Sequence, residues 1–155
     1  MVGSIEVRPV QLSDAARLNV MCWYERTTQD SDELLQRTQK LAFARRGLGA
    51  VALFDGALCG FGLLTMWPGV AEISDLVVNA RYRRRGIGSA LITYLGETAR
   101  KLGADTLEIG VALSNPRALA LYRRLGFTDH HVIELDLGNG PELVLYLRRT
   151  LPTRT

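Results

Sequence analysis

The sequence predicts an α+β fold of the three-layer α/β type, in which helices flank a mixed and mainly antiparallel sheet. Apolar residues recur with period two in some segments and with a period near 3.6 in others, and glycine or proline separates these segments. The resulting order is β-α-α-β-β-β-α-β-α-β-β, in which a helical crossing between strands predicts one parallel pair. A chain of 155 residues predicts a single domain over residues 1–155, with only the last few residues, Pro152–Thr155, frayed.

The N-terminal third is predicted to contain one strand and two helices. Pro9 removes a backbone donor and so places the first strand at an edge of the sheet. Ser13 or Asp14 is expected to cap the first helix, and Gly47 or Gly49 to end the second. The predicted elements are a strand over residues 5–11, a helix over about 15–26 and a helix over 31–46.

Turn residues divide the rest of the chain into six strands and two helices. Asp55-Gly56 is a strong hairpin signal, and Gly60 and Gly62 permit a bulge or a close backbone approach in the strand that follows. Pro116 suits the first turn of a helix, because the donor it lacks has no partner there. The predicted strands cover residues 50–54, 58–67, 70–78, 106–113, 130–137 and 142–147, and the predicted helices cover 87–102 and 116–125.

The composition indicates an ordinary globular protein. Hydrophobic residues make up 47% of the chain and charged residues 23%. A net charge of +3 is too small to indicate a nucleic-acid partner by itself, and no apolar run approaches membrane-spanning length. Cys22 and Cys59 lie in apolar surroundings without metal-ligand spacing, and the N-terminus lacks a signal-peptide pattern. We therefore expect a cytoplasmic protein with no nucleic-acid or membrane partner.

An anion site is predicted where arginines and glycines join a strand to a helix. The segment 81–90 follows an apolar run that ends at Val78, and the helix that begins at Ile87 has backbone N–H groups without an intrahelical partner. These groups, the helix dipole and the arginines favour a phosphate or pyrophosphate, which Gly86 and Gly88 allow to approach the backbone. An ordinary turn, a solvated basic face and a nucleic-acid footprint are the alternatives.

Two motifs and the order of elements resemble the GCN5-related N-acetyltransferase (GNAT) family. Glu72–Val78 followed by Arg83-Arg-Arg-Gly-Ile-Gly88 is similar to the family's Arg/Gln-x-x-Gly-x-Gly/Ala signature. Asn115–Phe127 is similar to its Asn…Ala…Leu-Tyr…Gly-Phe segment. The resemblance covers nearly the whole chain. It implies an acyl-CoA N-acyltransferase-like fold, in which the sheet splays between its fourth and fifth strands, 70–78 and 106–113.

The resemblance implies acetyl-CoA as the co-substrate and no metal. Backbone amides of Arg84–Ser89 would hold the pyrophosphate, and the end of strand 70–78 would pair with the pantetheine arm as an added strand does. The side chain of Asn115 would contact that arm, although the same residue also suits a simple helix cap. The implied cofactor-binding residues are Leu76, Val77, Val78, Arg83, Arg84, Arg85, Gly86, Ile87, Gly88, Ser89, Asn115 and Tyr122.

Acetyl transfer needs a neutral amine, a donor to the developing oxyanion and a proton for the departing thiolate. The resemblance places Tyr122 near the coenzyme sulfur as the proton donor, although the leucines around it also fit a core aromatic. Glu72, acting through a water, is the first candidate for the base and Asp75 the second. Alternatively neither acts as the base, and the carboxylate faces solvent or pairs with an arginine. The backbone N–H of Val77 or Val78 is the candidate oxyanion donor.

The predicted function is acetyl-CoA-dependent transfer, without a covalent enzyme intermediate, to a primary amine of a small molecule or a protein. A non-catalytic acyl-CoA-binding regulatory module is the main alternative, and a nucleic-acid binder is the third. The amine acceptor and the oligomeric state stay open, and a homodimer fits the family. Side chains that could border the acceptor site, besides ordinary core or helix-end roles, are Trp23, Tyr24, Glu25, Asp30, Asp32, Glu33, Trp67, His130 and His131.

Overall fold

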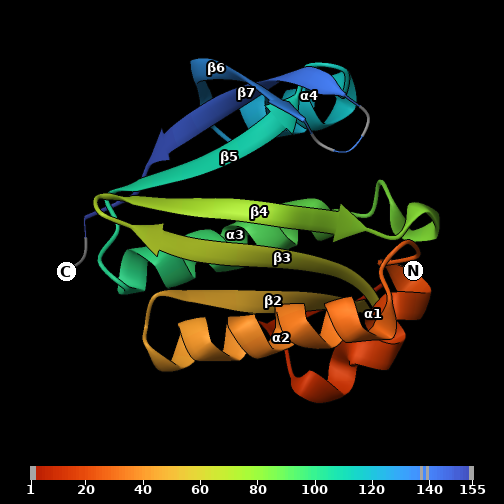
Figure 1. Cartoon of the computed structure of the whole chain (residues 1–155). Helices are drawn as coiled ribbons and strands as arrows, with labels where there is room; N and C mark the ends of the chain where they lie inside the picture. Colours follow the sequence, from red (N-terminus) through yellow and green to blue (C-terminus); the bar gives the residue numbers. More distant parts are fainter. Residues whose placement is uncertain (1–2, 137, 139, 154–155) are drawn as a thin grey trace.

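The computed structural model describes residues 3–136, 138 and 140–153, and it confirms the predicted fold class (Figure 1). The strands are β1 (Ile5–Pro9), β2 (Gly47–Phe54), β3 (Ala57–Trp67), β4 (Val70–Val78), β5 (Thr106–Ala112), β6 (Thr128–Asp136) and β7 (Pro141–Thr150). The helices are α1 (Ala15–Met21), α2 (Thr28–Phe43), α3 (Ile87–Lys101) and α4 (Pro116–Arg124), with 3-10 turns at Leu12–Asp14 and Ala80–Tyr82. The sheet has the order β1-β2-β3-β4-β5-β7-β6, and among the strand pairs described only β4 and β5 are parallel.

Helices cover both faces of the sheet, and each face has its own hydrophobic core. α1 and α2 pack over β2 and β3, where Leu35 and Phe61 are fully buried. α3 packs on the opposite face, where Leu91 and Leu95 meet β2, β3 and β4. Figure 1 shows α2 in front of β2 and α3 behind β3 and β4. We call these two layers the α2 side and the α3 side of the sheet.

The sheet splays between β4 and β5, as the resemblance implies. Their register runs only from Val70–Ile73 against Thr106–Ile109, and Figure 1 shows the strands diverging toward their C-terminal ends. A bulge lies in the diverging half of β4. Two residues of β4, Asp75 and Leu76, stand opposite the single Gly62 of β3, and Asp75 takes a positive φ of 54°. The end of β4 therefore has no strand partner toward β5 within the described chain.

The bulge reverses the alternation of side chains along β4. Ile73 packs in the core on the α3 side, and after the bulge Leu76 and Val78 pack against the same core. Val77 instead packs on the α2 side. The neighbouring strand makes room for this arrangement, since a Cβ on Gly62 would lie 3.2 Å from the Leu76 side chain. The bulge thus directs two apolar side chains at the end of β4 toward α3.

Several helix ends differ from the predictions. α1 is shorter than expected because Cys22 leaves the helical region with φ −132°. α2 begins earlier because the side chain of Thr27 caps it by accepting a backbone hydrogen bond at 3.0 Å. The end of α2 was also predicted wrongly. Arg45 takes the positive φ of 58° after the helix, whereas Gly47 and Gly49 lie in β2.

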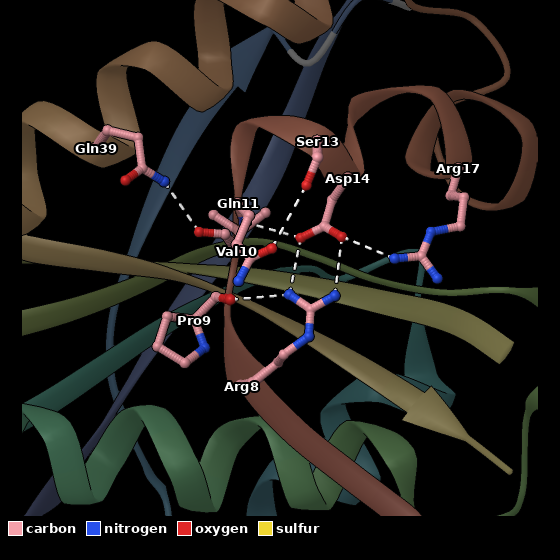
Figure 2. Close-up of polar contacts among 8 residues, drawn as sticks. All are labelled: Arg8, Pro9, Val10, Gln11, Ser13, Asp14, Arg17 and Gln39. Carbon is pink, nitrogen blue, oxygen red and sulfur yellow. Dashed lines mark hydrogen bonds and ion pairs between the residues drawn. The ribbon is translucent and has the colours of Figure 1, made fainter. Parts of the chain in front are cut away.

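A buried carboxylate joins the end of β1 to the start of α1 (Figure 2). Asp14 occupies the N-cap position of α1, one of the two alternatives predicted, but its side chain accepts no hydrogen bond from a backbone N–H of that helix. Instead, its two oxygens accept hydrogen bonds from the Arg8 guanidinium, both at 2.9 Å. They also accept from the Gln11 backbone N–H at 2.8 Å and from Arg17 Nη2 at 3.0 Å. Asp14 is therefore a charged link between β1 and the first helix.

The structure also tests the predictions made for the two cysteines and for membrane-spanning segments. Cys22 and Cys59 are both buried, in keeping with the apolar residues around them in the sequence, and burial raises the pKa of the Cys22 thiol to about 12. Among the helices described, none is long and apolar enough to cross a membrane. The predicted strand end at Leu137, the turn residue Asn139 and the terminal residues 154–155 lie outside the described residues.

Candidate active site

A cavity of about 550 Å³ opens between the end of β4, the start of α3 and α4. It lies on the α3 side of the sheet, where β4 has separated from β5. The lining residues are Leu76, Val78, Tyr82, Arg83, Arg84, Gly86, Ile87, Gly88, Ser89, Asn115, Arg117, Ala118, Leu121 and Arg124. All the predicted cofactor-binding residues except Val77, Arg85 and Tyr122 are therefore brought together around one cavity.

The start of α3 presents backbone donors to this cavity. Ala90 makes the first helical hydrogen bond, to the Gly86 carbonyl at 3.0 Å, so the N–H groups of residues 87–89 precede the helical ladder. No side chain caps α3, and Gly86 occupies the N-cap position with a left-handed φ of 81°. Arg84 also takes a positive φ, 65°. This loop leaves the positive end of the helix dipole open to an anion.

Two predicted cofactor-binding side chains lie away from the cavity. The Arg85 guanidinium stacks over the rings of Phe54 and Tyr82, at 5.0 Å and 5.7 Å from their centroids. It borders a separate hollow of about 420 Å³. The side chain of Val77 packs in the core on the α2 side, so this residue can act at the site only through its backbone.

The N-terminal cap of α4 borders the cavity. Asn115 Oδ1 accepts a hydrogen bond from the Ala118 N–H at 3.2 Å, which makes the residue a helix cap. Its side-chain nitrogen makes no hydrogen bond with another described residue and remains available to a ligand. The neighbouring Ser114 hydroxyl donates to the Glu142 carboxylate. Asn115 therefore combines the cap with a position in the cavity wall.

Tyr122 lies on the core side of α4. It is 7% exposed, and its ring centroid lies 6.4 Å from that of Phe127. Every fully buried polar side-chain atom of the described residues has a hydrogen-bond partner, yet the Tyr122 hydroxyl has none among them. That hydroxyl is therefore not fully enclosed by the described residues. Burial raises the pKa of Tyr122, so the phenol stays protonated at neutral pH.

The two candidate bases have different surroundings. Glu72 is half-buried on the α2 side of β4, and its Oε1 accepts a hydrogen bond from Trp67 Nε1 at 3.0 Å. It forms no ion pair with another described residue. Asp75 is exposed, lies 3.7 Å from the Arg26 guanidinium and accepts a hydrogen bond from the Ser74 hydroxyl at 3.1 Å. Asp75 thus fits the alternative of a carboxylate paired with an arginine.

Strand register gathers five polar residues on the α2 side of the sheet, across β4, β5, β7 and β6. Glu72 pairs with Glu108 across β4 and β5, and Arg148 of β7 pairs with Glu108 through an ion pair of 2.8 Å. His131 of β6 pairs with Tyr146 of β7, and their rings stack at 5.0 Å with an interplanar angle of 6°. We call Glu72, Glu108, His131, Tyr146 and Arg148 the open-face cluster.

Tyr146 is the central member of the open-face cluster. Its ring stands over Gly110, where a Cβ would lie 2.9 Å from Tyr146 Cε1. The pKa of Tyr146 is raised first by burial and then by the negative charges of Glu72 and Glu108. Sequence reasoning missed Tyr146, Glu108 and Arg148, because no local signal reports the register between β5 and β7.

The two adjacent histidines do not point in opposite directions, as a regular strand would require. The register of β6 shifts between Asp129 and His131, which places His130 in a bulge. The Nδ1 atoms of His130 and His131 lie 2.7 Å apart. His130 is exposed and His131 half-buried, so His131 is the one that belongs to the open-face cluster.

The other candidate acceptor-site residues are separated by the fold. Trp67 is exposed and joins the open-face cluster through its bond to Glu72. Trp23 is buried and packs edge-to-face against Phe61 at 5.0 Å, whereas Tyr24 is exposed and donates to the Met21 carbonyl at 2.8 Å. The acidic candidates are exposed around the start of α2 and comprise Glu25, Asp30, Asp32 and Glu33.

The sequence model of the acetyltransferase (GNAT) family matches residues 12–127, a span that includes the loop before α3 and all of α4. The chain therefore belongs to this family. An uncharacterized N-acetyltransferase of Methanocaldococcus jannaschii is 42% identical over 65 residues, which are 42% of this chain and 29% of that protein. YvbK, an uncharacterized N-acetyltransferase of Bacillus subtilis, is 40% identical over 86 residues, 55% of this chain and 56% of its own length.

An alanine N-acetyltransferase of ribosomal protein bS18 from Escherichia coli is 33% identical over 75 residues, 48% of this chain and 51% of that enzyme. The chain thus spans between 29% and 56% of the length of these relatives. The structure of the Salmonella typhimurium acetyltransferase yncA with acetyl-CoA aligns with a TM-score of 0.79 at 19% identity, over 97% of this chain and 95% of that one. The structure of the ribosomal-protein-S18-alanine N-acetyltransferase from Escherichia coli gives 0.77 at 20% identity, over 98% and 97%.

Proposed function

We propose that this chain transfers an acetyl group from acetyl-CoA directly to a primary amine of a small molecule or a protein. The observation that supports it most is the cavity at the splay, where the uncapped start of α3 meets arginines from two elements. Membership of the acetyltransferase family and the yncA structure, described with its cofactor acetyl-CoA, support the same co-substrate. A cytoplasmic location and a homodimer stay predictions.

The cavity residues fit the parts of coenzyme A. Residues 84–89 would hold the diphosphate through backbone N–H groups, and Gly86 and Gly88 leave this backbone approachable. The end of β4 has backbone groups free toward β5, which suits the amides of the pantetheine arm. The side-chain nitrogen of Asn115 would contact the same arm from α4. The proposal assigns no metal to the site.

The proposed reaction brings the two substrates together across the splayed sheet. The amine attacks the acetyl carbonyl carbon from the open-face cluster, a C–N bond forms, the C–S bond breaks and the thiolate takes up a proton. Tyr122, kept protonated by its raised pKa, would supply that proton. Glu72 would accept the amine proton through a water. The backbone N–H of Val77 or Val78 would stabilise the oxyanion.

The direct test measures acceptor-dependent thiol release by the purified chain. Acetyl-CoA is mixed with a peptide that begins with alanine, a lysine peptide, a polyamine and an aminoglycoside, and the product is identified by mass spectrometry. We expect coenzyme A release with at least one acceptor class. Acetyl-CoA protection in a thermal melt without acceptor-dependent release across a wide panel would instead favour the regulatory module.

The variant Gly88→Val tests the approach of the coenzyme to the start of α3. A Cβ at Gly88 would make only an ordinary contact of 3.6 Å with Leu121, so the fold accepts a side chain that then projects into the cavity. We expect about 100-fold weaker acetyl-CoA binding, since steric overlap costs roughly 3 kcal/mol, measured by calorimetry. Gly88→Ala is the graded control and should fall between wild type and Gly88→Val. Unchanged affinity of Gly88→Val would place the coenzyme elsewhere.

The variant Glu72→Gln tests the assignment of the base. It keeps the shape of the side chain and an acceptor for Trp67, but it cannot accept the amine proton. We expect kcat at neutral pH to fall about 100-fold, with a smaller loss at higher pH where the amine is already neutral. Asp75→Asn is the matched control and should change kcat less than about twofold, because Asp75 is exposed and paired with Arg26. The reverse pattern would make Asp75 the base.

A further inference from the structure

Four arginines line the cavity, and they come from two elements of the fold. Arg83 and Arg84 come from the loop before α3, and Arg117 and Arg124 come from α4. None of the four forms an ion pair or a side-chain hydrogen bond with another described residue. The next arginine of α4 behaves differently, since Arg123 forms a two-point ion pair with Asp129 at 2.7 Å and 3.1 Å. The cavity therefore concentrates positive charge without a counter-ion from the described protein.

This arrangement favours an anionic ligand, because four exposed guanidinium groups border one cavity and none has a described counter-ion. The backbone groups at the start of α3 already provide a site for the diphosphate, whose charge is matched by the two loop arginines. The positive charge of the two α4 arginines is then not matched by the diphosphate. It would be matched by a second phosphate that carries about two negative charges.

The geometry of α4 allows its two arginines to bind one phosphate group together. Arg117 and Arg124 are seven residues apart, about two turns, so they lie on one face of the helix. Ala118 and Leu121 also line the cavity from α4, which identifies that face as the one turned to the ligand. Arginine offers planar, multi-donor contacts that match phosphate oxygens.

We propose that Arg117 and Arg124 bind the 3′-phosphate on the ribose of coenzyme A, so that this chain selects acetyl-CoA over 3′-dephospho-acetyl-CoA. The inference rests on the proposed function, because it assigns a second phosphate site to the same coenzyme. α3 and its loop hold the diphosphate, and α4 holds the terminal phosphomonoester. The cavity thus has two phosphate-binding sites, one at the start of α3 and one on α4.

The experiment is a calorimetric titration with both acetyl-CoA and 3′-dephospho-acetyl-CoA. The proteins are wild type, Arg117→Ala, Arg124→Ala, the double variant and Arg123→Ala as the matched control on the same helix. Each single variant should bind acetyl-CoA about tenfold more weakly, while its affinity for 3′-dephospho-acetyl-CoA changes less than about twofold. Arg123→Ala should change neither affinity. All these side chains are exposed, so the variants should melt close to wild type.

The possible results test the assignment of the 3′-phosphate site and the proposed function separately. An equal loss for both ligands in Arg117→Ala and Arg124→Ala would overturn the inference and assign α4 to the diphosphate. Full affinity of the double variant for acetyl-CoA would also overturn it. In both cases the wild type still binds acetyl-CoA, so the proposed function stands. A wild type that binds neither ligand would instead contradict the proposed function itself.

Discussion

Replacement of Tyr122 by phenylalanine is expected to lower kcat about 1,000-fold, with acetyl-CoA affinity changed less than about threefold. The variant removes only a hydroxyl, which has no hydrogen-bond partner among the described residues. The ring keeps its place against Phe127, so the core on the α3 side should be undisturbed. The measurement is steady-state thiol release at saturating acetyl-CoA, together with a calorimetric titration of the coenzyme.

Tyr94→Phe is the matched control for this prediction. Tyr94 is a half-buried tyrosine on α3 whose pKa is also raised by burial, but it lies outside α4 and has no proposed part in the reaction. Its variant should keep kcat within about twofold of wild type. Because burial raises the pKa of Tyr122, wild-type activity should show no loss of this donor as the pH rises to about 10. If Tyr122→Phe kept the wild-type kcat, Tyr122 would not be the proton donor and would be an aromatic residue of the core.

Elements bounded by strong turn residues could be predicted from the sequence. β4 begins and ends at the predicted residues, Val70 and Val78. The Asp55-Gly56 hairpin is confirmed, and both residues take the positive φ values, 48° and 85°, that the tightest hairpin turns require. The loop before α3 was also predictable as part of a cavity wall, because its glycines and arginines are contiguous in sequence.

Features that depend on distant pairing could not be predicted in the same way. Tyr146 meets Gly110 and His131 only because β7 lies between β5 and β6, an order that no local pattern contains. The bulge that brings His130 beside His131 is likewise set by the partner strand. The end of α2 was predicted wrongly for a related reason, since Arg45 adopts a backbone conformation that sequence rules assign to glycine.

The arginines of α4 depart from the sequence pattern of an ordinary amphipathic helix. In an ordinary amphipathic helix, the face turned inward is apolar. Tyr122 is the one buried residue of α4, and Arg117 and Arg124 share the face that lines the cavity with Ala118 and Leu121. That mixture departs from the helical pattern because this part of the sheet has opened and the helix faces a cavity instead of a core.

Replacement of Asp14 by asparagine is expected to lower the free energy of unfolding by about 3 kcal/mol, the largest stability effect we predict. The carboxylate is fully buried and bonds to Arg8, Arg17 and the Gln11 N–H (Figure 2). The amide keeps one acceptor and turns an N–H₂ group toward the Arg8 guanidinium, which loses its counter-ion. The measurement is urea unfolding at neutral pH. Arg17→Ala is the control and should cost less than about 1 kcal/mol, because Arg17 is half exposed.

The pH dependence of this effect follows from the pKa of Asp14. Burial would raise that pKa, but the hydrogen bonds from Arg8, Gln11 and Arg17, with the charge of Arg8, together lower it below its ordinary value of 3.8. The Asp14 carboxylate therefore binds a proton more readily in the unfolded chain than in the folded protein. Its contribution to stability is fully present at a pH above the ordinary pKa of 3.8, and it is lost as the pH falls through the lower pKa of the folded state. The stability difference between wild type and Asp14→Asn should hold constant down to about pH 5 and shrink only in stronger acid. A difference that already vanished near neutral pH would show that the ion pair contributes little and that the asparagine is accommodated.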